Sequence, residues 1–175
     1  HKVISYLMII TFISMVAVAF TSQMTWQPFF LDNGFQEHWF GYLFSAAMLL
    51  GIFVPYITKP LLKASKKHKY YFIGIVLFMA STLLLIKVSN SLIFLLILFM
   101  LFIGGYDLEQ PVWQKFFQRH TKSKIRATVS SFNTMLQALV ILVFAPIVGY
   151  LADKISPESV LFLAGFIMLP MIYFY

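Results

Sequence analysis

Long apolar runs, separated by short clusters of charged residues, dominate this chain. The runs cover residues 3–31, 40–62, 70–87, 91–114, 127–151 and 158–175. A helix that crosses a bilayer needs about 20 predominantly apolar residues, and each run comes close to that length or exceeds it. The pattern predicts an all-α integral membrane protein with six transmembrane helices. The short connections between the runs predict a single domain over residues 1–175.

Composition agrees with a membrane environment and removes several classes of function. Hydrophobic residues make up 61% of the chain and charged residues 11%, whereas soluble domains carry about 25% charged residues. Cysteine is absent, and His38, His68 and His120 fall in separate connections, so we expect neither a metal site nor a cofactor. The basic residues form no continuous face, so we expect no nucleic-acid partner. The first run is too long for a cleavable signal peptide.

The basic residues divide unequally between the two sides of the predicted bundle. Lys87 and Lys154 are the two basic residues on one side, together with several carboxylates. The other eleven of the thirteen basic residues share the opposite side: Lys2, Lys59, Lys63, Lys66, Lys67, Lys69, Lys115, Arg119, Lys122, Lys124 and Arg126. Because short cytoplasmic loops are enriched in Lys and Arg, both chain ends are predicted to be cytoplasmic, in a multi-pass protein of the plasma membrane.

The two halves of the chain share features that indicate an internal repeat. Gln27-Pro28 near the end of the first run matches Gln110-Pro111 near the end of the fourth, and the second and fifth runs carry Pro55 and Pro146 late in their sequence. Three helices followed by three similar helices start on opposite membrane faces, so the relation is a 3+3 inverted repeat, as in many secondary transporters. The alternative is that these prolines only curve helices around one another.

One segment resembles a known family. Residues 126–131, Arg-Ala-Thr-Val-Ser-Ser, and the Pro-x-x-Gly-x-x-x-Asp pattern of Pro146, Gly149 and Asp153 resemble the eleventh helix of a major facilitator superfamily permease, and residues 104–119 are similar to the tenth. The resemblance implies the C-terminal six-helix half of a twelve-helix transporter, with the other half supplied by the same chain or a separate one. The loop motif Gly-x-x-x-Asp-Arg of the family is replaced here by Pro-Tyr-Ile-Thr-Lys-Pro at residues 55–60. Gating or structural roles are assigned to Pro28, Pro111, Arg126, Pro146, Gly149 and Asp153.

Two groups of polar residues are candidates for binding a solute. Gln23 and Gln27 lie at i and i+4 beside Trp26 and Phe30, a mixture of amides and aromatic faces that suits an amphipathic organic molecule. On the fifth run a polar stripe at helical spacing predicts either a wetted cavity wall or interhelical hydrogen bonds of about 0.6 kcal/mol each. The substrate-binding candidates are Gln23, Trp26, Gln27, Phe30, Tyr106, Asn133 and Gln137.

Asp107 and Glu109 are the acidic residues within a predicted span. A charged carboxylate at the centre of a transmembrane helix costs about 2.5–3.5 kcal/mol, so it must be compensated or protonated, and such residues are functional candidates by default. Two positions correspond to about 200° of rotation, so the two side chains are expected on different helix faces. We expect Glu109 to be the principal proton-coupling group and Asp107 the second. The alternative is that both side chains reach water or pair with Lys115.

The expected function is that of a secondary active transporter half that moves a small organic solute by alternating access, coupled to protons as a symporter or antiporter. The alternative is a six-helix substrate-binding subunit of a multi-component vitamin transporter. No enzymatic activity is expected, because the sequence contains neither a Gly-x-Ser-x-Gly nor a His-Glu-x-x-His motif. The sequence leaves open which solute is moved and in which direction.

Overall fold

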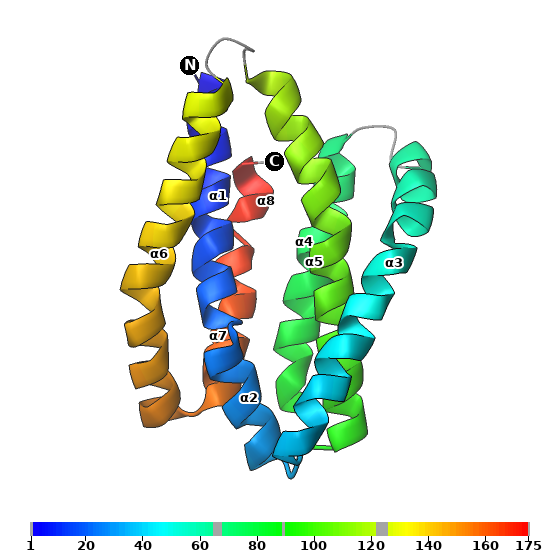
Figure 1. The fold of residues 1–175 in the computed structure, drawn as a ribbon, viewed down its shortest axis with the longest axis vertical. Helices are drawn as coiled ribbons and strands as arrows, with labels where there is room; N and C mark the ends of the chain where they lie inside the picture. Colours follow the sequence, from blue (N-terminus) through cyan, green and yellow to red (C-terminus); the bar gives the residue numbers. More distant parts are fainter. Residues whose placement is uncertain (1, 65–67, 89, 122–125, 175) are drawn as a thin grey trace.

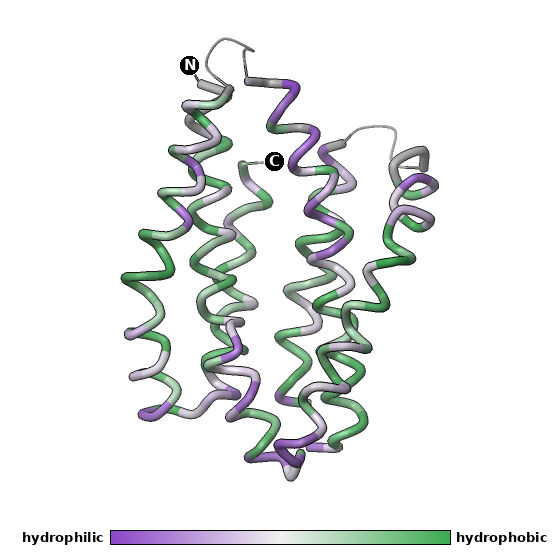
Figure 2. Tube along the Cα trace, viewed as in Figure 1, coloured by the Kyte–Doolittle hydropathy of each residue, from purple (hydrophilic) through white to green (hydrophobic). Residues whose placement is uncertain are grey.

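The computed structural model describes residues 2–64, 68–88, 90–121 and 126–174, and every element in these ranges is helical. Six helical segments are long and apolar enough to cross a membrane, which confirms the predicted number of spans. These segments are Tyr6–Asp32, Glu37–Leu61, Lys69–Val88, Leu92–Arg119, Ala127–Ile155 and Pro157–Phe174. Figure 2 shows hydrophobic residues along the length of the helices and hydrophilic residues mainly towards their ends.

The first span is divided into two helices, α1 (Lys2–Phe20) and α2 (Gln23–Asp32). The division falls at Thr21 and Ser22, where the Thr21 hydroxyl donates a 2.9 Å hydrogen bond to the Ala17 carbonyl and Ser22 has an extended backbone. The apolar pattern alone predicts one continuous helix here and misses this break.

The second and third spans follow after a tight turn. Gly34 has a φ of 85°, which few residues other than glycine adopt, and it leads into the short 3₁₀ helix η1 (Glu37–Trp39) and α3 (Phe40–Ala64). The third span consists of α4 (His68–Leu84) and the 3₁₀ turn η2 (Leu85–Val88).

The last three spans begin with α5 (Leu92–His120) and α6 (Arg126–Ile155). The sixth comprises α7 (Pro157–Met168) and α8 (Met171–Phe174). Ser156 caps α7, since its hydroxyl accepts a 3.2 Å hydrogen bond from the Ser159 backbone N–H, and Pro157 occupies the first turn where no donor is needed.

The helices form one bundle with α3 and α6 on opposite flanks (Figure 1). In the spans of α3 and α6 17% of the residues are buried inside the protein, against 50% in the span of α4. The helix α1 packs along α6 and α7, while α4 packs along α5 and α7. One end of the bundle, which we call the basic end, carries the chain's N-terminus, the last turns of α3 and α5 and the first turns of α4 and α6 (Figure 1).

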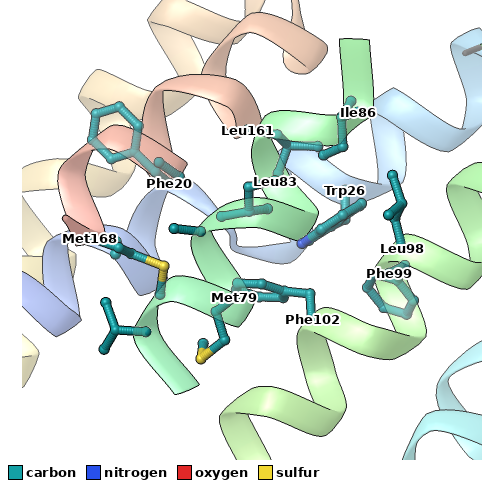
Figure 3. Close-up of a cluster of buried hydrophobic side chains, with 14 of the residues drawn as sticks. Phe20, Trp26, Met79, Leu83, Ile86, Leu98, Phe99, Phe102, Leu161 and Met168 are labelled. Carbon is teal, nitrogen blue, oxygen red and sulfur yellow. The ribbon is translucent and has the colours of Figure 1, made fainter. Parts of the chain in front are cut away.

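A dense aromatic and aliphatic core joins α2, α4, α5 and α7. The Trp26 ring lies with its centroid 4.8 Å from that of Phe99 and 5.5 Å from that of Phe30. In Figure 3, Trp26 lies between Leu83 of α4 and Phe99 of α5, with Leu161 of α7 nearby. Lipid tails are as apolar as these side chains, so this core stabilises the bundle by close packing rather than by removal from water.

Candidate solute cavity between α5 and α6

A cavity with a volume of about 750 Å³ lies between the C-terminal part of α5 and the N-terminal part of α6. Five amide side chains, two hydroxyls and two aromatic rings contribute to its wall, and the described lining residues include no ionisable side chain. The lining residues are Gln110, Trp113, Gln114, Phe117, Gln118, Ala127, Ser130, Asn133, Thr134 and Gln137. The described part of the wall is therefore polar and uncharged, and the cavity lies at the basic end.

Helical periodicity places the amides of both helices on this cavity. Gln110, Gln114 and Gln118 occupy positions i, i+4 and i+8 of α5, so their side chains line one face of that helix. Asn133 and Gln137 occupy i and i+4 of α6, as the sequence pattern predicts, and line the same cavity. The two stripes form walls of one space rather than packing directly on each other.

Sequence reasoning missed the contribution of Gln114 and Gln118. The signal was present, because three glutamines at intervals of four residues repeat the pattern recognised on α6. On α6 itself, the Thr134 hydroxyl donates a 3.2 Å hydrogen bond to the Ser130 backbone carbonyl. Asn133 Oδ1 is buried without a hydrogen-bond partner among the described residues. An amide oxygen in this position favours a ligand or water that donates to it.

The two acidic residues of α5 lie in different environments, as their spacing predicts. Glu109 is 4% exposed and lines a small cavity of about 20 Å³ together with Thr11 and Ser14 of α1 and Gln137 of α6. Asp107 is on the side of α3, where its Oδ2 atom lies 3.4 Å from the position that a Cβ on Gly51 would occupy.

The small cavity adjoins the large one, because Gln110, Trp113 and Gln137 line both. A volume of about 20 Å³ is enough for one water molecule. The Thr11 hydroxyl, which is 2% exposed and has no hydrogen-bond partner among the described residues, is a polar neighbour for such a water. The side chains of Gln110, Trp113 and Gln137 therefore lie between Glu109 and the large cavity, because they line both cavities.

The candidates on the first span are distributed over two environments. Gln23 and Trp26 line a second cavity of about 450 Å³ between the α1–α2 break, α3, α5 and α6. Phe30 is 1% exposed in the aromatic core, where it stacks on Trp26. Gln27 is partly buried on α2. The cavity wall is mainly apolar, so Trp26 serves both as a core residue and as part of this wall.

The remaining candidates lie along the transmembrane helices. Tyr106 is partly buried on α5. Pro28, Pro111 and Pro146 lie inside α2, α5 and α6.

Two further candidates lie towards the end of α6. A Cβ on Gly149 would meet no atom within 4 Å, and Asp153 is exposed near the end of the helix. Arg126 is the first residue of α6, and its side chain lies outside the part of the chain that the structure describes.

Comparison with known proteins decides the family. The family model described as Major Facilitator Superfamily matches residues 3–175. The chain belongs to the major facilitator superfamily. Neither the curated proteins nor the solved structures give a match. This major facilitator chain is therefore a multi-pass membrane protein of a transporter family, as its six apolar helices indicate. It has half the size of a complete permease.

Proposed function

We propose that this chain is the C-terminal six-helix half of a secondary transporter that moves a small organic solute by alternating access. The observation that carries the proposal is the amide-lined cavity between α5 and α6. Polar side chains within a membrane helix bundle face the bundle interior or a water-filled space, because lipid offers them no hydrogen bonds. Their concentration on two facing helices indicates a path for a solute that exchanges hydrogen bonds with water for hydrogen bonds with amides.

The chemistry of this wall favours an uncharged solute. Amides and hydroxyls both donate and accept hydrogen bonds, and the rings of Trp113 and Phe117 offer apolar faces beside them. A charged solute would require a countercharge in the wall, and the described residues that line it provide none. We therefore propose a neutral organic molecule with several hydrogen-bonding groups and an apolar face.

The pattern of helix contacts supports the 3+3 inverted repeat. In such a repeat α1 is equivalent to α5, α3 to α6, and α4 to α7. The contact between α1 and α6 then corresponds to the contact between α5 and α3, and the contact between α1 and α7 corresponds to that between α5 and α4. The contact between α4 and α7 corresponds to itself, because the repeat exchanges these two helices. A repeat of this kind gives the two membrane faces related structures, which is how secondary transporters expose one site to each side in turn.

We further propose that the basic end faces the cytoplasm of a cell whose plasma membrane holds the protein. Lys59, Lys69, Lys115 and Arg119 are exposed at this end, and short cytoplasmic loops are enriched in such residues. In this orientation the cavity between α5 and α6 opens towards the cytoplasm. The family match also favours a permease over a vitamin-binding subunit that docks on a separate module.

A second six-helix half, in the same or a separate chain, is proposed to supply the opposite wall. The flanking helices α3 and α6 expose apolar residues such as Met48, Ile52 and Leu142, which suit contact with lipid or with another helix bundle. Purified as a monomer, these 175 residues are expected to show no saturable transport in vesicles. Saturable transport by the monomer would contradict the need for a second half.

Proton coupling is assigned to Glu109, because it is a buried carboxyl group whose cavity adjoins the proposed solute path. In the complete transporter, Glu109→Gln is expected to abolish gradient-driven accumulation and to preserve energy-independent exchange of the solute. Asp107→Asn is the matched comparison, since it neutralises a carboxyl group on the other side of the same helix. If Glu109→Gln still accumulates solute with an unchanged pH profile, Glu109 is not the coupling group.

A further inference from the structure

Oxygen-bearing side chains from three helices meet at the small cavity beside Glu109. The helix α1 contributes Thr11 and Ser14, which lie one turn apart, α5 contributes Glu109 and Gln110, and α6 contributes Gln137. Thr11 and Glu109 are 2% and 4% exposed, so the cavity lies in the interior of the bundle. Its volume of about 20 Å³ leaves room for one water molecule or one small ion.

The hydroxyl of Thr11 differs from other threonine hydroxyls in the bundle. Thr21, Thr82 and Thr134 each donate a hydrogen bond to a backbone carbonyl of the preceding turn, as threonines within helices commonly do. Thr11 Oγ1 is buried and has no hydrogen-bond partner among the described residues. A buried polar atom of this kind indicates an occupant of the cavity that it lines.

The charge of the cavity wall indicates which occupant fits. The described lining residues include one carboxylate, that of Glu109, and no basic side chain. An ionised carboxylate inside the membrane is costly unless a positive charge or a proton neutralises it. A water molecule satisfies the hydroxyl of Thr11 but leaves the charge of Glu109 in place. A cation does both, because the oxygen of Thr11 and the carboxylate can contact it together.

The number of carboxylates and the size of the cavity favour a small monovalent cation. Carboxylate, hydroxyl and amide oxygens are ligands for hard cations. One carboxylate balances one positive charge, so a divalent ion would leave a net charge in the bundle. In the part of the chain that the structure describes, no group of three His, Cys, Asp or Glu residues could hold a metal ion. The small volume favours Na⁺ over the larger K⁺.

We infer that this cavity is a sodium site, in which Glu109 supplies the charge and Thr11, Ser14 and Gln137 supply neutral oxygen ligands. Na⁺ and the coupling proton are alternative occupants of Glu109, since a protonated carboxyl group has no charge to hold the ion. For its role in transport the inference rests on the proposed function, which assigns coupling to Glu109. Binding of the ion itself requires neither a solute nor a gradient.

The test measures equilibrium binding of radioactive Na⁺ to the complete transporter in nanodiscs, without solute and with choline chloride holding the ionic strength constant. Saturable binding is expected, and unlabelled Na⁺ should displace the label at concentrations at which K⁺ does not. Absence of saturable binding would overturn the inference and leave water as the occupant of the cavity. Equal displacement by K⁺ and Na⁺ would overturn the assignment to sodium.

Variants assign the binding to this cavity. Glu109→Gln is expected to abolish saturable binding, and Thr11→Val, which keeps the shape of the side chain, should weaken it at least tenfold by removing one oxygen ligand. The matched control is Thr25→Val, since Thr25 is also buried without a hydroxyl partner among the described residues but does not line the cavity. If Glu109→Gln fails to fold, the comparison of the two threonine variants still decides. Equal binding by Thr11→Val and Thr25→Val would overturn the inference.

Failure of the sodium site and failure of the proposed coupling give different results. A transporter that accumulates solute on a proton gradient but binds no Na⁺ contradicts the sodium site alone. A transporter that binds Na⁺, and whose Glu109→Gln variant still accumulates solute with an unchanged pH profile, contradicts the proposed coupling alone.

Discussion

The hydroxyl of Tyr71 donates a 2.8 Å hydrogen bond to the backbone carbonyl of Leu108. The bond joins α4 to α5 just before Pro111, which has no N–H with which to continue the backbone hydrogen bonds of α5. Leu108 directly precedes Glu109 in the sequence. This interhelical bond joins α4 to the part of α5 from which Glu109 and the cavity amides project.

Removal of this bond is expected to weaken the bundle measurably. Tyr71→Phe should lower the free energy of unfolding by about 1 kcal/mol, because it leaves the ring in place and removes one buried hydrogen bond. The matched control is Tyr70→Phe at the neighbouring, 62% exposed tyrosine, where little change is expected. Equilibrium unfolding in mixed micelles measures both variants. Equal stabilities for Tyr71→Phe and the unchanged protein would show that the bond contributes nothing.

Substitution of two glycines by alanine is expected to have opposite effects on stability. A Cβ on Gly165 of α7 would lie 3.2 Å from the Ala80 backbone oxygen and 3.1 Å from Leu84 on α4. Gly165→Ala should therefore destabilise the protein by about 1–3 kcal/mol through overpacking against backbone that cannot move aside. Gly104→Ala, where a Cβ would meet no atom within 4 Å, should be neutral or slightly stabilising. Thermal unfolding of the two variants side by side distinguishes these outcomes.

The six spans were predictable because each is defined by its own composition, which tertiary packing does not change. The break between α1 and α2 was not, since Thr21 and Ser22 lie within an apolar run and the sequence carries no proline or glycine there. Helix ends were also longer than predicted. The amphipathic end of α5 continues to His120, well beyond the apolar run that ends at residue 114.

The candidate site was predictable where a helical stripe of polar residues carries it, as for Asn133 and Gln137. Trp26 and Phe30 illustrate the limit, because a neighbouring pair of aromatic residues has the same sequence pattern in a cavity wall and in a core. Their position in the aromatic cluster depends on Phe99, which comes from α5. The spacing of residues within one helix does not indicate which other helix packs against them.

The proposed orientation of the protein in the membrane can be tested at the two ends of α5. Absence of cysteine from the chain makes labelling of introduced cysteines specific. Gln118 and Asn90 are exposed near opposite ends of α5, and the proposed orientation places Gln118 in the cytoplasm. On intact cells, an impermeant thiol reagent should label Asn90→Cys and should label Gln118→Cys only after the membrane is opened. External labelling of Gln118→Cys would reverse the orientation. It would also place the segments of residues 63–69 and 119–124 outside the cell.

The central claim is that the amide wall between α5 and α6 forms part of the solute path. Its most direct test is solute exchange without an energy source, measured in vesicles that contain the complete transporter and a solute selected from sugars, nucleosides, peptides and hydrophobic drugs. Gln114→Leu and Gln137→Leu should each reduce exchange at least tenfold, because each removes hydrogen bonds to the solute and leaves the helices apolar. Gln36→Leu, a change at an exposed glutamine outside the cavity, should retain full exchange. Unchanged exchange in both cavity variants would contradict the assignment of the solute path to this cavity.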